Sequence, residues 1–243
     1  MNIVRLDSTT STNTWTALHD KDLESPSLVY SINQTAGRGQ RGNSWESQPG
    51  KNITASLIFH PDNFPAHRQF LISEIIALAI VDFLKGHGIS AKIKWPNDIY
   101  VGNKKICGIL VEHVVVGKTI SRSIAGFGIN INQEVFLSDA PNPVSLSQLT
   151  GLKYDIETEI NSLASIIGNY LAKLSTDSSD INHDEFLKNL WRHDGNFYKF
   201  FDRNRTQYIE ARINSVSTDG TLTLSTIDGD SRKYAFKEIE FVI

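Results

Sequence analysis

Residues 91–131 read AKIKWPNDIYVGNKKICGILVEHVVVGKTISRSIAGFGINI, and this stretch decides the fold. Its connections Gly102-Asn103 and Gly117-Lys118 are short enough for tight hairpin turns, which need residues that tolerate positive φ. The stretch therefore predicts a run of antiparallel strands joined by hairpins. These strands are expected at residues 91–95, 98–101, 105–116 and 119–131.

Helices are predicted on both sides of this sheet. Apolar side chains recur at helical spacing between residues 67 and 85, and Gly86 and Gly88 supply left-handed stop positions after them. Two further helices are expected at residues 155–174 and 184–192, with a polar loop at 175–183 between them. Two strands are expected at residues 28–32, which read as buried, and 52–60.

The pattern changes from about residue 200 onward. Short segments of period-2 character follow one another, with turns at Asp219-Gly220 and Asp228-Gly229. Such a pattern is typical of a small β-barrel. We therefore expect two domains, a larger one over residues 1–195 and a β-domain over 196–243.

Composition limits the classes of function. The chain has 243 residues, 24 basic against 27 acidic side chains and 40% hydrophobic residues, which is typical of an ordinary globular protein without a nucleic-acid-coating surface. A single cysteine, Cys107, excludes an internal disulfide and fits a reducing compartment, so we expect a cytoplasmic protein. The most apolar stretch, 70–84, is too short to span a membrane, and the N-terminus lacks a secretory signal pattern.

The loop GRGQRG, residues 37–42, is the first candidate for chemistry. It matches the glycine pattern of dinucleotide-binding folds, but the following residues contain Pro49 and Gly50 and show no helical period. Arg38 and Arg41 would supply always-charged donors to phosphate or carboxylate oxygens. The loop is interpreted as an anion clamp, with a solvated surface loop as the alternative.

The second candidate is KWPND, residues 94–98, followed by KKICG at 104–108. A carboxylate such as Asp98 suits Mg²⁺, which takes oxygen ligands and bridges to phosphates. Lys105 begins an apolar strand, so we expect its stem to be pinned and its ammonium to point into a site. The alternatives are a simple turn after Pro96 and a lysine on a strand edge.

Two uncharged groups complete the candidates. GFGIN, residues 126–130, places two glycines in a strand, where a ligand or another backbone must come close, and Asn130 offers both a donor and an acceptor. Ser11, Thr12, Asn13 and Gln34 suit a neutral urea or amide ligand. The alternatives are a β-bulge at the glycines and a helix N-cap at Ser11.

The order and spacing of these motifs closely resemble the biotin protein ligase family (biotin–[acetyl-CoA-carboxylase] ligase), in its monofunctional form without an N-terminal DNA-binding domain. The resemblance covers residues 5 to about 135. It rests on STN, then QxxGRGxRGxxW ending at Trp45, then KWPND, then KKIxGILxE ending at Glu112, then GxGIN.

The resemblance implies a fold and a reaction. The fold is α+β, a mixed or antiparallel sheet flanked by helices (class II aminoacyl-tRNA synthetase/biotin ligase-like), with a small C-terminal SH3-like β-barrel. Residues 1–195 would be the catalytic biotin/ATP-binding domain. The reaction joins biotin to ATP, with Mg²⁺, to give biotinyl-5'-AMP, and then passes biotin to a lysine of the biotin carboxyl carrier protein of a biotin-dependent carboxylase.

The resemblance also assigns roles to residues. The catalytic group would comprise Lys105, Arg38 and Asp98, with Asp98 as the metal ligand and a candidate proton acceptor. Biotin would be bound by Ser11, Thr12, Asn13, Gln34, Arg38, Gly39, Gln40 and Lys105. ATP and the adenylate would be bound by Arg38, Arg41, Trp45, Asn97 and Asn130. Cys107 is expected to be buried and unreactive.

One departure from the family pattern predicts a kinetic difference. Gln40 stands where members commonly carry a basic residue, and Asn43 and Ser44 likewise replace commoner basic residues. With fewer cations in the loop, we expect the acyl-adenylate to leave this site more readily.

Expectations about partners follow from the same comparison. The ligand motif begins at residue 11, which leaves no room for a preceding helix-turn-helix domain, so no nucleic-acid partner is expected. No membrane partner is expected, and the chain would be a monomer or a homodimer. Two rival functions remain, a lipoate or octanoyl transferase and a non-catalytic biotin or nucleotide sensor.

Overall fold

A computed structural model describes residues 1–138, 142–174 and 179–243, without the side chains of residues 41 and 179–181. The main sheet has the strand order β1-β2-β5-β10-β9-β8-β7, and β6 pairs with β10. Strands β1 and β2 run parallel and the other neighbours run antiparallel, so the sheet is mixed, as expected. Its strands are β1 (Asn2–Thr9), β2 (Ser27–Gln34), β5 (Ile53–Phe59), β6 (Phe64–Pro65), β7 (Lys92–Lys94), β8 (Asp98–Val101), β9 (Lys104–Val116) and β10 (Thr119–Ile129).

The antiparallel run predicted from residues 91–131 is confirmed. Strands β7 to β10 follow one another in the sheet, and their ends lie within two residues of the predicted ones. Gly102 and Gly117, at the two predicted turns, have φ of 58° and 61°. Both hairpins therefore depend on residues that enter the left-handed region without steric cost.

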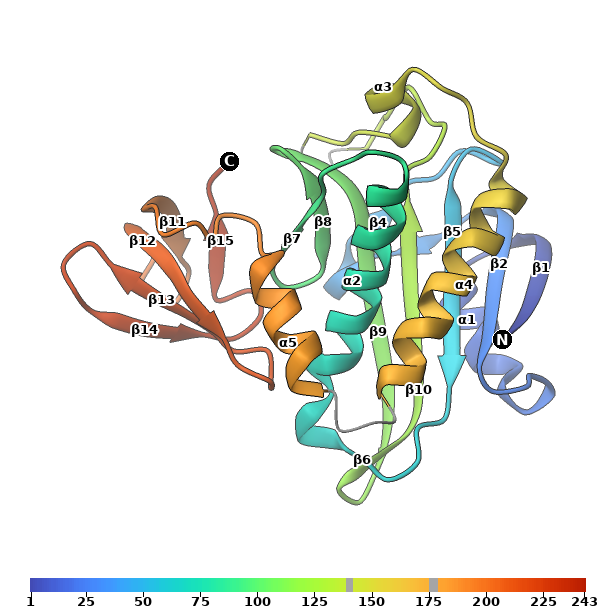
Figure 1. The fold of residues 1–243 in the computed structure, drawn as a ribbon, viewed down its shortest axis with the longest axis horizontal. Coiled ribbons are helices and arrows are strands. Elements are labelled where there is room, and N and C mark those ends of the chain that lie inside the picture. Colours follow the sequence, from blue (N-terminus) through green and yellow to red (C-terminus); the bar gives the residue numbers. More distant parts are fainter. Residues whose placement is uncertain (139–141, 175–178) are drawn as a thin grey trace.

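Helices cover both faces of the sheet (Figure 1). Helix α2 (Phe70–Gly86) packs on one face beside α4 (Ile156–Leu174) and α5 (Ser179–Lys188), while α1 (Thr12–Leu18) lies against β5 and β10 on the other. Almost all side chains of α2 are buried, which explains why its sequence is apolar around most of its circumference. No helix in the described ranges combines the length and apolarity that crossing a membrane requires.

The predicted helices are found with changes at their ends. Gly88 has φ of 75° and follows α2, whereas Gly86 is the last residue of the helix and has no positive φ. Helix α5 covers residues 179–188, so residues 179–183 are helical where a polar loop was expected, and residues 189–192 lie beyond its end. The remainder of that loop, 175–178, lies outside the described residues. A short helix, α3 (Leu146–Thr150), was not predicted.

The C-terminal strands form a separate antiparallel sheet of order β14-β13-β12-β11-β15, visible at the left of Figure 1. The predicted segments are present, and the first strand, β11, was not predicted. Closure into a barrel and the domain boundary at 195/196 stay predictions. The strands are β11 (Tyr198–Asp202), β12 (Gln207–Val216), β13 (Leu222–Thr226), β14 (Ser231–Tyr234) and β15 (Ile239–Phe241).

The C-terminal sheet is attached to the main sheet through aromatic side chains. Trp95, 1% exposed, donates its indole N–H to the carbonyl of Gly220 at 3.0 Å. Phe236 packs against Trp95 and Phe70 with ring centroids 5.3 and 5.9 Å apart. The buried apolar cluster is therefore continuous across the two sheets.

Candidate active site

A cavity of about 660 Å³ brings together segments that are far apart in the sequence. Its walls come from the start of α1, the end of β2, the strands β8 to β10 and the loop that carries the short strands β3 (Gly37–Arg38) and β4 (Ser44–Trp45). The predicted site residues that line it are Ser11, Thr12, Asn13, Gln34, Arg38, Gly39, Gln40, Trp45, Asn97, Asp98, Lys105 and Asn130. Arg41 lies in the 3-10 turn Gln40–Gly42, and its side chain is outside the described part of the structure.

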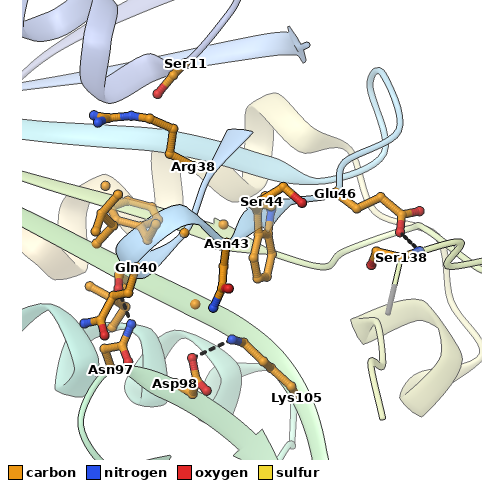
Figure 2. Close-up of a pocket in the computed structure, with 18 of the residues that line it drawn as sticks. Ser11, Arg38, Gln40, Asn43, Ser44, Glu46, Asn97, Asp98, Lys105 and Ser138 are labelled. Carbon is orange, nitrogen blue, oxygen red and sulfur yellow. Dashed lines mark hydrogen bonds and ion pairs between the residues drawn. The ribbon is translucent and has the colours of Figure 1, made fainter. Parts of the chain in front are cut away.

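Lys105 and Asp98 point toward each other at the floor of the cavity (Figure 2). The Lys105 Nζ lies 2.6 Å from Asp98 Oδ1, and the two side chains are 23% and 16% exposed. The backbone of Lys105 is held on both sides, because its N–H donates to the Asn142 carbonyl and its carbonyl accepts from the Val144 N–H, each at 2.9 Å. The backbone of this lysine is thus fixed and its side chain lines the cavity, whereas the pinned stem stays a prediction.

A second lysine approaches the same carboxylate. Lys94 Nζ lies 3.9 Å from Asp98 Oδ2. The same Nζ lies 5.2 Å from the ring centroid of Tyr100 and 5.0 Å from that of Phe241. Burial lowers the pKa of Lys94, and the charge of Asp98 opposes this effect. Lys105 lines the cavity and Lys94 does not, so Lys105 is the ammonium of this pair that faces an anion in the cavity.

The same contacts count against a ready-made magnesium site at Asp98. Both of its oxygens face lysines, and the described residues contain no group of three His, Cys, Asp or Glu side chains placed to hold a metal. Mg²⁺ in phosphate-transferring sites is bound by one or two carboxylates together with the phosphates of the substrate. The role of Asp98 as a metal ligand therefore stays a prediction.

The glycine–arginine loop forms a short hairpin instead of leading into a crossover helix. β3 pairs with β4, and the 3-10 turn Gln40–Gly42 lies between them. This hairpin differs from the strand-to-helix turn of a dinucleotide-binding fold. Arg38 donates to Glu112 Oε2 at 2.7 Å, with both side chains more than two-fifths exposed. In this structure its guanidinium is thus already bound by a carboxylate of β9.

The uncharged residues form a connected hydrogen-bond network at the start of α1. Gln34 Oε1 accepts from the backbone N–H of Thr12 at 2.9 Å, and Ser56 Oγ lies 2.6 Å from Asn13 Oδ1. Asn13 Nδ2 donates to Glu112 at 2.8 Å. Ser11 precedes the helix but makes no side-chain cap, so its buried hydroxyl remains available in the cavity.

Protein side chains occupy the space above the two glycines of β10. A Cβ atom at Gly126 would lie 2.1 Å from Asn13 Oδ1, and one at Gly128 would lie 2.2 Å from the Trp45 indole. The glycines thus leave room for the side chains of Asn13 and Trp45. The sequence had predicted that a ligand or another backbone comes close at this place. The bulge alternative is wrong at this place, because the register with β9 shifts only between Ile120 and Arg122.

Trp45 lies beside the catalytic candidates. Lys105 Nζ is 5.7 Å from the centroid of its ring, and its Nε1 is buried without a hydrogen-bond partner among the described residues. The indole nitrogen faces β10, because a Cβ atom at Gly128 would lie 2.2 Å from it. The indole is therefore placed to form one wall of the cavity.

The two asparagines each use one side-chain group within the protein. Asn97 donates to the Ile109 carbonyl at 2.6 Å, and Asn130 donates to the Val144 carbonyl at 3.1 Å. The Oδ1 atoms of both residues have no hydrogen bond within the described residues. At Asn130 the Oδ1 acceptor and the second N–H of Nδ2 are thus both left for a ligand.

Several residues of the site were not identified from the sequence. Glu112 was quoted in a motif without a role, yet it holds both Arg38 and Asn13. Glu46 lines the cavity, and although its burial alone would raise its pKa, hydrogen bonds from the Leu137 and Ser138 amides lower the pKa (Figure 2). Lys237 reaches the cavity from the C-terminal sheet, and no local pattern signals this long-range contact.

Cys107 is fully buried, as expected. Burial raises the pKa of its thiol, which keeps the reactive thiolate unpopulated. Cys107 therefore takes no part in the chemistry of the cavity.

Comparisons with known proteins agree on one family. The model of the biotin/lipoate A/B protein ligase family matches residues 3–130, a little over half of the chain. A biotin–[acetyl-CoA-carboxylase] ligase of Paracoccus denitrificans is 31% identical over 178 residues, which cover 70% of this chain and 73% of that protein.

Other relatives are longer than the matched region. The bifunctional ligase/repressor BirA of Bacillus subtilis is 39% identical over 134 residues, which span 53% of this chain but only 40% of the relative. The match therefore covers about two-fifths of the length of that curated relative.

A solved structure reproduces the fold over nearly the whole chain. It is a biotin protein ligase from Aquifex aeolicus in complex with biotin and ATP, with a TM-score of 0.80, 22% identity, and coverage of 99% of this chain and 98% of that one. At this identity the likeness shows the fold. Together with the family match and the Paracoccus relative, it leads to one conclusion: the chain belongs to the biotin/lipoate A/B protein ligase family.

Proposed function

We propose that the chain is a biotin–[biotin carboxyl-carrier protein] ligase, which uses ATP to attach biotin to a lysine of a carrier protein through biotinyl-5'-AMP. The observation that carries the proposal is that Lys105 and the uncharged Ser11–Asn13 and Gln34 cluster line the same cavity. An acid with a neutral ring system needs both kinds of group in one place, a cation for its carboxylate and hydrogen-bonding groups for its amides.

Biotin would bind by its ureido ring to the uncharged cluster. The Ser11 hydroxyl is free to donate or accept, and Gln34 keeps its Nε2 amide group for a ligand carbonyl. Thr12 and Asn13 hold these groups through the contacts with Gln34 and Ser56. The backbone of Arg38 to Gln40 would close over the ring.

In the first step, an oxygen of the biotin carboxylate attacks the α-phosphorus of ATP. A new P–O bond forms, the bond to the β-phosphate bridging oxygen breaks, and pyrophosphate leaves. Lys105 would lie between the two anions, where one fixed charge at 4 Å is worth about 4 kcal/mol at an effective dielectric of about 20. Since the backbone of Lys105 is fixed and Asp98 contacts its ammonium before the substrates arrive, little reorganisation is needed.

The nucleotide would be held by the remaining predicted residues. Arg38 and Arg41 would bind phosphate oxygens, Trp45 would form a wall for the adenine, and the free Oδ1 atoms of Asn97 and Asn130 would accept hydrogen bonds. Mg²⁺ would enter with the phosphates and neutralise part of their charge.

In the second step, the amine of the carrier lysine attacks the carbonyl carbon of biotinyl-5'-AMP. A C–N bond forms, the C–O bond to the phosphate breaks, and AMP leaves with the electron pair. The ammonium of the carrier lysine must first lose a proton to become the attacking amine, and the Asp98 carboxylate, which lies 2.6 Å from the Lys105 Nζ, is the candidate acceptor.

The proposal includes a carrier protein or carrier domain of a biotin-dependent carboxylase as partner and a cytoplasmic location, where Cys107 stays reduced. It includes no DNA-binding activity. A monomer and a homodimer both fit it.

The testing experiment mixes the protein with ATP, Mg²⁺, biotin and a biotin carboxyl carrier domain, and detects labelled carrier with avidin. A carrier whose target lysine is replaced by arginine is the control. We expect labelling with biotin and none with the control carrier. Transfer of lipoate but not biotin would identify a lipoate ligase, and tight biotin binding without transfer would identify a sensor; either result contradicts the proposal.

A further inference from the structure

Lys237 is a lysine of the C-terminal sheet that lines the main cavity, far along the chain from the other lining residues. It lies in the turn between β14 and β15 and is half-buried. The turn is closed by a hydrogen bond from the Glu238 N–H to the Ala235 carbonyl at 3.2 Å. Lys237 is the third of the four residues of this turn.

The backbone of Lys237 is in a conformation that a lysine rarely adopts. Its φ is 71°, as the third residue of a type II turn requires, and that position favours glycine or asparagine. A side chain with a Cβ atom is strained there. Such an outlier beside a cavity points to a role for the side chain, because glycine would build the same turn without strain.

The position of the turn is fixed by its neighbours. Phe236, directly before Lys237, packs against Phe70, the first residue of α2, and against Trp95, which follows β7. The Glu238 carboxylate accepts from the Ala235 N–H at 2.7 Å, so it is occupied within the turn. Lys237 is thus held at the cavity by packing on one side and a closed turn on the other.

The charges along the cavity single out this lysine. Lys105 is paired with Asp98, and Arg38 is paired with Glu112. Within the residues that the structure describes, the Lys237 ammonium has neither a hydrogen bond nor an ion pair. Among the described cationic side chains that line the cavity, it is therefore the one without an anionic partner in the protein.

We propose that Lys237 binds phosphate oxygens of the nucleotide, so that the C-terminal sheet supplies a binding residue to the active site. The inference rests on the proposed function, which brings a polyphosphate into this cavity. A charge-assisted hydrogen bond to phosphate would make Lys237 a determinant of nucleotide affinity, and the strained turn would serve to direct it there.

Titration calorimetry of the full chain with MgATP tests the proposal. Lys237→Gly removes the charge and relieves the backbone strain, and Lys237→Arg keeps the charge. We expect Lys237→Gly to weaken MgATP binding about tenfold, as the loss of one charged hydrogen bond does, without lowering the melting temperature. Lys237→Arg should bind within about twofold of the wild type.

Two controls separate binding from structure. Lys233→Gln removes one charge from an exposed position of β14 that does not line the cavity, and it should leave MgATP affinity unchanged. Adenosine, which has no phosphate, should bind the wild type and Lys237→Gly equally.

Three results would overturn the inference. Wild-type affinity for MgATP in Lys237→Gly would remove Lys237 from the site, and an equal loss of adenosine and MgATP binding would assign it a structural role. A wild-type chain that binds no nucleotide would overturn the proposed function and this inference together, whereas the first two results leave the proposed function standing.

Discussion

The loop over residues 37–45 and the strands β8 to β10 both line the cavity, yet they hold their polar side chains differently. On the strands, Lys105 is fixed by two backbone hydrogen bonds and by Asp98. On the loop, Arg38 is fixed by one ion pair between side chains that are more than two-fifths exposed. Exposed pairs contribute about 1 kcal/mol or less, so the strands form the rigid part of the site and the loop the adaptable part.

Lys105→Ala should show the largest effect, because it removes the cation of the rigid part. We expect adenylation, measured as biotin-dependent pyrophosphate release, to fall at least about 10²-fold. Lys104→Ala, an exposed neighbour on the same strand, is the matched control and should change the rate little. A near-wild-type rate in Lys105→Ala would remove the lysine from its proposed role.

Gly126→Ala and Gly128→Ala each add one methyl group, and together they test the difference between the strands and the loop. At residue 126 the new methyl group meets Asn13, which is buried and held by Ser56 and Glu112. Overpacking a held neighbour costs about 1–3 kcal/mol, so chemical denaturation should show a loss of that size.

At residue 128 the methyl group meets the Trp45 indole, which belongs to the adaptable loop. We expect a smaller loss of stability and a clear change in tryptophan fluorescence, because the loop can move away. Gly168→Ala in α4, where a Cβ has nothing within 4 Å, is the control and should stabilise by about 0.5–1 kcal/mol. Equal losses at residues 126 and 128 would contradict the difference between loop and strands.

Gln40→Arg should sharpen the same contrast by adding a cation to the loop. We expect release of biotinyl-5'-AMP, measured without carrier, to slow about two- to fivefold, as one exposed ion pair permits. Gln207→Arg, an exposed glutamine of β12, makes the same change away from the cavity and should have no effect. An unchanged release rate in Gln40→Arg would show that loop charge does not retain the intermediate.

Glu112→Gln should have the smallest effect on stability. It weakens the pair with Arg38 but keeps an acceptor for Asn13, so the free energy of unfolding should change by less than about 1 kcal/mol. Limited trypsin cleavage after Arg38 should nevertheless become faster. Glu157→Gln, which breaks the similarly exposed pair with Arg5, is the control and should leave that cleavage rate unchanged. Unaltered cleavage in Glu112→Gln would mean that this pair does not hold the loop.

The parts of the fold with strong local signals were predictable from the sequence. The hairpins at Gly102 and Gly117 have turn residues with positive φ. In α2, apolar side chains recur at helical spacing, which differs from the period of two in strands. Strands β1 and β11 were missed, although the positive-φ residues Gly195 and Thr206 flank β11. β1 gains its hydrogen bonds only by lying parallel to β2 at the sheet edge.

The site was predictable where motifs carry it and not where distant segments meet. The predicted site residues whose side chains are described line one cavity. The contacts that fill the space above Gly126 and Gly128 join β10 to α1 and to the loop, and sequence spacing does not report them. The same holds for Lys237, which follows Phe236, a residue packed on Trp95.

The tryptophan of KWPND faces the C-terminal sheet and donates to the Gly220 carbonyl. Trp95 is three residues before Asp98, so the bond between this indole and Gly220 also anchors the segment that carries Asp98 to the cavity. The two units are consequently not interchangeable modules. A chimera that received a foreign C-terminal sheet would need to provide an acceptor for this indole and an aromatic partner at position 236, or it would disturb the chemistry it was meant to leave untouched.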